Sequence, residues 1–158
     1  MAKGKDLAPG DRAPAFRLQT DDGGPVASAS LKGQPYVLYF YPKDNTPGCT
    51  KEAVEFSGAK RKFDAANVAV IGISKDSVES HEKFRKKHNI KITLGSDSDL
   101  EVAKSYGVWG EKTLYGRKFM GMERATFLVD GRGVIRDVWR KVKVPQHVEA
   151  VLAAAKSL

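Results

Sequence analysis

The only cysteine of this chain, Cys49, stands where the sequence changes from a strand-like pattern to a helix-like one. An apolar run over Tyr36–Tyr41 ends at Pro42, and apolar residues after Cys49 recur every three or four positions, the spacing of one helix face. A helix N-terminus leaves backbone N–H groups unpaired and carries a partial positive charge, and both features favour a thiolate over a thiol. The sequence therefore predicts a nucleophilic thiol at the start of a helix.

The position of the cysteine decides between a catalytic and a structural role. A lone cysteine is commonly a small apolar residue of a protein core. That role would fit a place inside the strand or on the apolar face of the helix, whereas Cys49 lies between Gly48 and Thr50, at the turn that joins them. We therefore favour the catalytic interpretation.

Three neighbours of Cys49 are candidates for its site. Thr46 stands three residues before it, where a hydroxyl can bond the sulfur or a bound oxygen; the simpler explanation is a turn or cap residue. Pro42 has no N–H and can shield a pocket without competing for hydrogen bonds; the simpler explanation is a strand stop. Glu52 is explained by the helix dipole alone, so we leave it outside the site.

Two buried strands and the helix between them have to position these residues. Residues 36–41 and 68–73 are short runs, rich in β-branched and aromatic residues, with apolar side chains on both faces. This pattern predicts central strands that are covered by helices on each side. Between the strands, a single helix is expected directly after Cys49, and its inner face consists of Ala53, Phe56, Ala59, Phe63 and Ala66.

The segments before and after these elements are predicted to support the site rather than to contribute to its chemistry. Residues 1–15 are polar and broken by prolines, which predicts a loosely held arm before an early strand around residues 16–18 and a turn at Asp21–Pro25. A second helix is expected over Val78–His88, with Asp76 or Ser77 as its N-cap and His81 as a packing residue rather than a ligand. A short helical pattern then ends at Gly107.

The last third of the chain alternates between irregular and regular patterns. Residues 108–118 carry aromatics between glycines, which favours a shaped loop or an irregular strand; Trp109 and Tyr115 are assigned to packing, with a pocket mouth as the alternative. Two strands are expected at 125–130 and 134–140 around a hairpin turn, before a closing helix over 146–156. This order of elements fits an α/β fold with a mixed central sheet flanked by helices.

Length and composition fit one globular domain over residues 1–158, since 41% of the residues are apolar and 29% are charged. No apolar stretch approaches the roughly 20 residues of a membrane-spanning helix, and Met1–Asp6 lacks the apolar segment of a signal peptide, so we expect a cytoplasmic protein without a membrane partner. One cysteine and three scattered histidines argue against a metal site, and the absence of a glycine-rich phosphate loop argues against nucleotide binding. We expect no cofactor.

The net charge of +8 raises the question of nucleic-acid binding. The basic residues form several short clusters with glutamates between them rather than one patch. A solvated surface explains them better than a nucleic-acid site, so no nucleic-acid partner is expected. Attraction of an acidic protein remains open.

The motif Pro42-x-x-x-Thr46-x-x-Cys49 resembles the active-site motif of the peroxiredoxins, thiol peroxidases with a thioredoxin-like fold. The likeness is greatest to the bacterioferritin-comigratory branch, also called peroxiredoxin Q, and runs from about Leu7 through the closing helix. Beyond the motif, it is carried by Tyr39–Asp44, Thr46–Glu52, Gly107–Lys112 and Glu123–Leu128.

This resemblance implies that Cys49 is the peroxidatic cysteine and that Pro42, Thr46 and Arg124 complete the catalytic site. The substrate would be hydrogen peroxide or an organic hydroperoxide, and the product on the protein a cysteine sulfenic acid. The chemistry needs a thiolate and fixed donors on the polarised oxygens, because removing one such donor in other enzymes costs on the order of 10² to 10³ in rate. Without the resemblance, Arg124 would read as a surface charge.

The chain departs from its relatives at the step that reduces the sulfenic acid. Many members of the branch carry a resolving cysteine five residues after the peroxidatic one, here Val54, and others carry it on the following helix, near Arg85. We therefore expect an external thiol from thioredoxin, glutaredoxin or a small molecule, and a monomer, because catalysis needs no second chain. Whether the missing cysteine is natural or was replaced is left open by the sequence.

Two other functions compete with the peroxidase. A noncatalytic thioredoxin-like module would bind an acidic partner through its basic surface, and its thiol would be unperturbed. A disulfide oxidoreductase is disfavoured, because that chemistry uses Cys-x-x-Cys and the third residue after Cys49 is Glu52.

Overall fold

The computed structural model of the protein describes residues 6–21 and 23–158. Within them, no helix is both long and apolar enough to cross a membrane. The helices are α1 (Pro47–Gly58), α2 (Lys60–Ala65), α3 (Val78–His88), α4 (Glu101–Ser105) and α5 (His147–Lys156), with a 3₁₀ turn η1 at Ser28–Leu31. The strands are β1 (Arg17–Thr20), β2 (Val26–Ala27), β3 (Tyr36–Phe40), β4 (Ala69–Ser74), β5 (Thr93–Ser96), β6 (Trp109–Leu114), β7 (Arg117–Met122), β8 (Ala125–Val129) and β9 (Ile135–Trp139).

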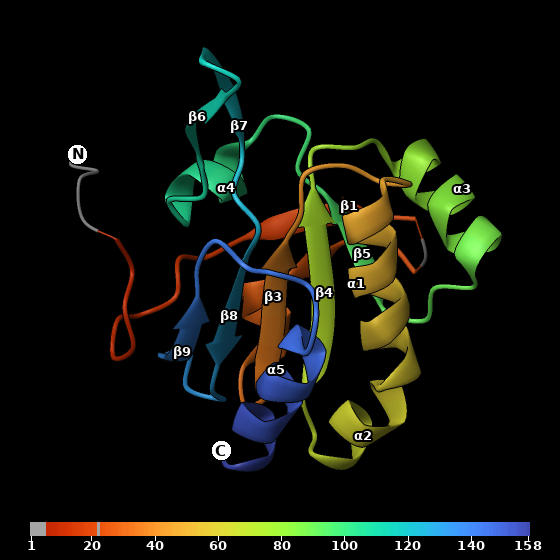
Figure 1. Ribbon diagram of the computed structural model, residues 1–158. Helices are drawn as coiled ribbons and strands as arrows, with labels where there is room; N and C mark the ends of the chain where they lie inside the picture. The colour runs from red at the N-terminus through yellow and green to blue at the C-terminus, as the bar shows by residue number, and fades with distance from the viewer. Residues whose placement is uncertain (1–5, 22) are drawn as a thin grey trace.

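A mixed seven-stranded sheet in the order β2-β1-β5-β4-β3-β8-β9 forms the centre of the protein (Figure 1). Strands β3, β4 and β5 are parallel, and β8 pairs with β3 in the antiparallel direction. Strand β3 is buried along its whole length because it has a partner on both sides and side chains packed on both faces. The thioredoxin-like α/β fold that the sequence predicted is confirmed.

Each face of the sheet has its own core because successive side chains of a strand point to opposite faces. Val37 and Tyr39 of β3 belong to a cluster with buried residues of α1, α2, α3 and α5. Leu38 and Phe40 belong to a second cluster with Val102 and other residues around α4. Three layers result: the sheet lies between α1, α2, α3 and α5 on one face and α4 on the other.

Tyr39 shows how α1 is held against the sheet. Its ring stacks on Phe56 of α1 with a centroid separation of 4.5 Å. On its other side it lies against Gly72, its partner in β4, where an added Cβ would stand 2.7 Å from Tyr39 Cζ. A glycine is therefore required in the neighbouring strand for the ring to lie beneath the helix, since any larger residue would overpack this core.

Several elements differ from those expected. The helix after Cys49 breaks at Ala59 into α1 and α2, which follows from the weak helix formers Ser57 and Gly58. Strands β2 and β5 were not predicted. Of the two alternatives for residues 108–118, a loop or an irregular strand, the strand is nearer, since residues 109–122 form a regular hairpin, β6–β7. The expected helix over Val78–His88 is confirmed, with Ser77 as its N-cap.

The described part of the N-terminal segment is bonded to the sheet more closely than a loose arm. Gly10 N–H donates to the carbonyl of Ile135 at 2.8 Å, and Ala13 N–H donates to that of Gly133 at 2.9 Å. Arg12 forms an isolated antiparallel bridge with Val134. The prolines that suggested a loop, Pro9 and Pro14, flank residues that pair with residues 133–135 at the start of β9; residues 1–5 lie outside the described part.

Candidate active site

The peptide between β3 and α1 places the cysteine. Helix α1 begins at Pro47, after the extended N-cap residue Thr46, so Cys49 is the third helical residue. Proline suits the first position because that residue needs no N–H, and the first-turn N–H groups have no acceptor within the helix. The start of a helix next to Cys49 is thus confirmed, but the cysteine lies inside the helix and in the apolar cluster between α1 and the sheet, and not at the turn before the helix as predicted. The side chain of Cys49 is buried, with 1% of its surface exposed.

Arg124, which lies between β7 and β8, reaches this helix terminus from 75 residues away in the sequence. Its Nη2 donates to Cys49 Sγ at 3.4 Å, and its Nη1 donates to Glu52 Oε1 at 2.7 Å. A Cβ on Gly48 would stand 3.1 Å from Nη2, so a glycine at that position lets the guanidinium approach the sulfur. The cation and the helix terminus both stabilise a thiolate.

Thr46 does not bond the sulfur. Its hydroxyl donates to the carbonyl of Lys43 at 2.8 Å, inside the same turn. This bond fixes the hydroxyl proton on the loop and leaves the lone pairs of Oγ1 as acceptors. Of the two partners considered from the sequence, a bound oxygen therefore fits Thr46 better than the cysteine sulfur does.

Pro42 and Arg124 line a groove of about 700 Å³, and Arg124 is the lining residue that contacts the cysteine. Its opposite walls are residues 107–113, which include most of β6, and the loop Lys141–Lys143 after β9. Trp109 lines this groove and also packs against the core, so it has both the packing role and the pocket role that the sequence left as alternatives. Tyr115 does neither, because it lies at the hairpin tip with 94% of its surface exposed.

Glu52 belongs to the site, although the sequence analysis left it out. It lies one turn after Cys49, on the same helix face, and its side chain is fully buried. Burial raises the pKa of Glu52 to about 7, against the lowering effect of the Arg124 guanidinium. Glu52 Oε2 has no hydrogen-bond partner among the described residues. The three-residue spacing was the signal that could have revealed this contact.

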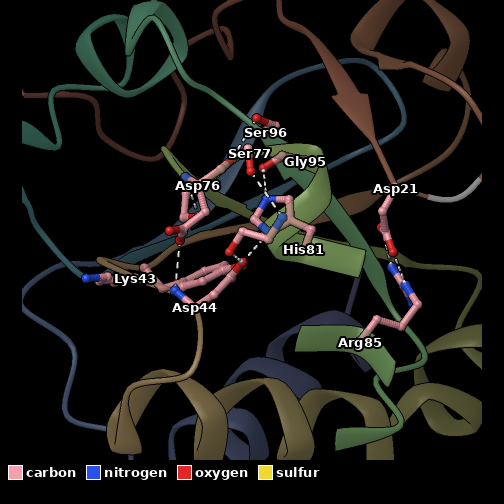
Figure 2. A network of polar contacts seen from close by, with 12 residues as sticks. Asp21, Lys43, Asp44, Asp76, Ser77, His81, Arg85, Gly95 and Ser96 are labelled. Atoms are coloured by element: carbon pink, nitrogen blue, oxygen red, sulfur yellow. Dashed lines mark hydrogen bonds and ion pairs between the residues drawn. The ribbon is translucent and has the colours of Figure 1, made fainter. Parts of the chain in front are cut away.

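A buried ion pair between Asp44 and His81 holds the loop between Pro42 and Thr46 in place (Figure 2). Asp44 accepts hydrogen bonds from Tyr41 Oη at 2.6 Å and from Ser80 Oγ at 2.8 Å, and its Oδ2 lies 2.7 Å from His81 Nδ1. The other ring nitrogen of His81 lies 3.0 Å from the carbonyl oxygen of Gly95. His81 is thus the packing residue that the sequence predicted, and an ion-pair partner as well.

Both neighbours of the His81 ring are acceptors, so both nitrogens must donate, and the ring is an imidazolium. Burial alone would lower the pKa of His81, but the hydrogen bond to Asp44 and its negative charge together raise it. The Asp44 N–H also donates to Asp76 Oδ2 at 2.8 Å. These contacts attach the active-site loop to α3 and β5. Asp44 was not predicted, because most of its partners lie 32 to 37 residues away in the sequence.

The comparisons with known proteins agree on one family. Residues 9–138 match the model of the AhpC/TSA family. The chain is 50% identical to a putative peroxiredoxin bcp of Coxiella burnetii over 143 residues, covering 90% of this chain and 95% of the relative. It is 43% identical to the peroxiredoxin Bcp of Bacillus subtilis over 149 residues, covering 94% and 95%.

Among solved structures, a mutant of PrxQ from Xylella fastidiosa superposes with a TM-score of 0.91 at 39% identity, covering 98% of both chains. The bacterioferritin comigratory protein of Xanthomonas campestris, described in terms of alkyl peroxide reduction, superposes with a TM-score of 0.87 at 38% identity, covering 96% of both chains. The chain belongs to the AhpC/TSA family. Within it, this protein is a peroxiredoxin of the Bcp/PrxQ branch, and hence a thiol peroxidase, so the alternative of a noncatalytic binding module is rejected.

This peroxiredoxin has no thiol at either position where its relatives carry a resolving cysteine. Val54 is an exposed residue of α1. Arg85 of α3 forms two bonds with Asp21, at 2.6 Å and 3.0 Å, which attach α3 to the turn after β1. An ion pair thus stands near the place where other members of the branch have a second redox group.

Proposed function

We propose that this peroxiredoxin reduces hydrogen peroxide and small organic hydroperoxides at Cys49, and that an external thiol returns the cysteine to its reduced form. The contact that carries the proposal is the 3.4 Å approach of Arg124 Nη2 to Cys49 Sγ at the first turn of α1. A guanidinium and a helix terminus together favour the anionic nucleophile that peroxide reduction requires.

In the oxidation step, the Cys49 thiolate attacks the terminal oxygen of the hydroperoxide. A sulfur–oxygen bond forms, the O–O bond breaks, the attacked oxygen keeps its proton as the sulfenic acid, and the other oxygen leaves as an alkoxide or hydroxide that takes a proton from water. Arg124 and the first-turn N–H groups stabilise the charge that moves along these oxygens. Thr46 Oγ1 accepts a hydrogen bond from the O–H group of the hydroperoxide, and Pro42 shields the sulfur from water.

In the reduction step, an external thiol attacks the sulfenic sulfur, forms a mixed disulfide and releases water. A second thiol then breaks that disulfide and restores Cys49. The support for this route is the sequence itself, which contains no other cysteine. Thioredoxin, glutaredoxin and small-molecule thiols are the candidate donors.

The test is to mix the reduced protein with one equivalent of hydrogen peroxide and to measure its mass after trapping sulfenic acid with dimedone. We expect one adduct on Cys49 in the wild type and none in the Cys49→Ser variant, which should also lose peroxidase turnover. Thr50→Ser, a change next to the cysteine that keeps the hydroxyl, serves as the matched control. An unmodified Cys49 thiol after exposure to peroxide would refute the proposal.

We also propose that the protein acts in the cytoplasm as a monomer, because its single thiol needs no partner chain to complete the cycle. Light scattering at micromolar concentration is expected to give the mass of one chain, 17.3 kDa, in both the reduced and the peroxide-treated state. A stable dimer in either state would contradict the monomer.

A further inference from the structure

The β6–β7 hairpin exposes an unusual amount of apolar surface. Among the described residues, the exposed large apolar side chains are Val54, Leu158 and four on this hairpin: Leu114, Tyr115, Phe119 and Met120. The two strands pair only with each other, and the hairpin extends beyond the main sheet next to α4 (Figure 1). A two-stranded hairpin with an uncovered apolar surface indicates an interaction site.

The register gives the hairpin one face that is both apolar and basic. Lys112 lies opposite Phe119, and Leu114 lies opposite Arg117. Residues directly opposite each other in an antiparallel pair point to the same face, so these four side chains share one face, which holds no acidic residue. The other face pairs Glu111 with Met120 and Thr113 with Lys118.

This face, which we call the basic hairpin face and define by Lys112, Leu114, Arg117 and Phe119, adjoins the active site. Lys112 lines the same groove as Pro42 and Arg124. Lys141 and Lys143 line the groove as well, and none of the three lysines forms an ion pair with a described acidic residue. Glu111 and Glu123 are the acidic residues of the groove, and Arg140 already pairs with Glu123 at 2.8 Å.

We propose that the basic hairpin face is the docking site for the protein thiol that reduces oxidised Cys49, and that this reductant has an acidic, partly apolar surface around its cysteine. The proposal rests on the proposed function, since only a sulfenic acid at Cys49 requires such a donor. Cys49 is 1% exposed, and the groove is lined by the Arg124 that contacts its sulfur, so we expect a folded reductant to approach with its thiol through this groove. A docking surface at the groove mouth orients that thiol, and the positive charge accelerates the encounter with an acidic protein.

The chemistry at the docked surface is the reduction already described. The thiolate of the reductant attacks the sulfenic sulfur, a mixed disulfide forms as the S–O bond breaks, and the leaving hydroxide takes up a proton, equal to the one that the thiol released, to give water. The second cysteine of a dithiol reductant then attacks its own partner sulfur, which releases the Cys49 thiolate and the oxidised reductant. Two electrons pass from the dithiol to Cys49, and no other oxidant or reductant is required.

The test compares two reductants on peroxide-oxidised protein: an acidic thioredoxin and dithiothreitol. In the double variant Leu114→Ser/Phe119→Ser and in Arg117→Glu, we expect the second-order rate constant with thioredoxin to fall about tenfold or more. The rate with dithiothreitol and the rate of oxidation by peroxide should stay within about twofold, since none of the three residues lines the groove. The matched control is Lys118→Glu/Met120→Ser, on the opposite face, which should leave all three rates unchanged.

Four outcomes overturn the docking proposal. They are an unchanged thioredoxin rate in the hairpin variants, an equal loss with both reductants, a wild-type protein that thioredoxin reduces no faster than dithiothreitol, and a wild-type dimer that the variants abolish. Failure of the proposed function looks different, because the wild type would then not form a sulfenic acid with peroxide at all. In the wild type, raising the ionic strength should slow reduction by thioredoxin but not by dithiothreitol, and Arg117→Glu should reduce this salt dependence.

Discussion

Arg124 is the residue on which the chemistry of the site depends most, after the cysteine itself. One guanidinium contacts both Cys49 Sγ and the buried Glu52 carboxyl, through two different nitrogens. The planar guanidinium group has several N–H donors in fixed positions and can make both contacts at once, which the single ammonium group of lysine cannot. The same guanidinium that we propose to stabilise the transition state therefore also holds the Glu52 carboxyl in place.

We predict that Arg124→Ala lowers the rate of Cys49 oxidation by hydrogen peroxide by about 10² to 10³, the usual cost of one lost donor to a developing oxyanion. Arg124→Lys should recover only part of this loss because one of the two contacts is missing. Stopped-flow tryptophan fluorescence or competition with a peroxide probe measures the rate. Arg61→Ala, at an exposed position of α2, is the control, and circular dichroism checks the fold. A full rate in Arg124→Ala would remove this residue from the site.

Glu52 makes a separate, pH-dependent contribution at the residue scale. Its pKa rises from 4.5 in the unfolded chain to about 7 in the folded protein, chiefly because burial disfavours the carboxylate. A carboxyl whose folded pKa is raised destabilises the fold as pH increases: its contribution is most favourable below about pH 4.5 and is lost between there and about pH 7. A shift of this size corresponds to about 3 kcal/mol.

We therefore predict that Glu52→Gln removes this component. The free energy of unfolding of the wild type relative to the variant should fall by about 3 kcal/mol between pH 4.5 and pH 7.5, and stay constant above that. Urea titrations at several pH values measure it. Glu149→Gln, an exposed position in the first turn of α5, should show no such slope. A difference that is independent of pH would mean that Glu52 is ionised throughout.

At the scale of the elements, α3 acts as the support of the active-site loop. Through His81 and Ser80 it contacts Asp44, and through His88 Nε2 it contacts Asn45 Oδ1 at 3.0 Å. Asn45 has a left-handed backbone conformation with φ of 67°, so the turn before α1 is held in a shape that most residues avoid. The helix that holds the loop is also the helix whose Arg85 stands near the second redox group of other members of the branch.

Because its pKa is raised, His81 should stabilise the fold most at low pH. Its contribution is fully present below the unfolded value of 6.5 and is lost as pH rises through the folded pKa. The charged or titratable groups around the ring are Asp44, Asp76 and Tyr41. We predict that His81→Gln costs about 3 kcal/mol at pH 6, because it leaves a buried carboxylate without its cation, and less at pH 9.

Urea titrations of the wild type and of His81→Gln from pH 6 to pH 9 measure this effect. The control is His88→Gln, which removes the half-buried contact of the same helix and should cost less than about 1 kcal/mol. A cost of His81→Gln that grows with pH would show that the ring is neutral in the folded protein.

At the scale of the whole molecule, the sheet joins segments of unequal stability. Strands β3 and β8 are buried along their whole length and pair with neighbours on both sides. The N-terminal segment adds backbone bonds to the other end of β9, while the hairpin β6–β7 stands outside the main sheet. Regions with few buried contacts open at a lower free energy than the core.

Hydrogen–deuterium exchange should show this order. We predict that the amides of Leu38 and Phe127 exchange slowest, those of Gly10 and Ala13 at an intermediate rate, and those of the hairpin residues Thr113 and Lys118 fastest among paired strands. Two-dimensional NMR of the reduced protein measures all six amides at once. Complete exchange of Gly10 and Ala13 within the dead time would show that the N-terminal segment is loosely held after all.

Local patterns were sufficient for the parts of the molecule that one segment determines. The buried strand over Tyr36–Tyr41, the helix after Cys49, the cap at Ser77, one of two candidates, and the turn after Val129 each depend on neighbouring residues. The structure confirms them, except that the helix is broken at Ala59. Strand β5 escaped prediction because Thr93–Ser96 is short and contains a glycine, and it becomes a strand only because β4 and β1 pair with it.

The sequence by itself therefore predicted Cys49 as the nucleophile, a helix that starts close to it and the mixed sheet behind it, and the structure confirms the helix and the sheet. Only the tertiary structure decided that Arg124 reaches the sulfur, that Glu52 shares that guanidinium, that Asp44 and His81 form a buried ion pair, and that the hairpin presents a basic apolar face beside the groove. Helix and strand periods are set by residues a few positions apart. These contacts instead join residues 37 to 75 positions apart or depend on a strand register. No local sequence pattern therefore indicates which distant side chains the fold brings together.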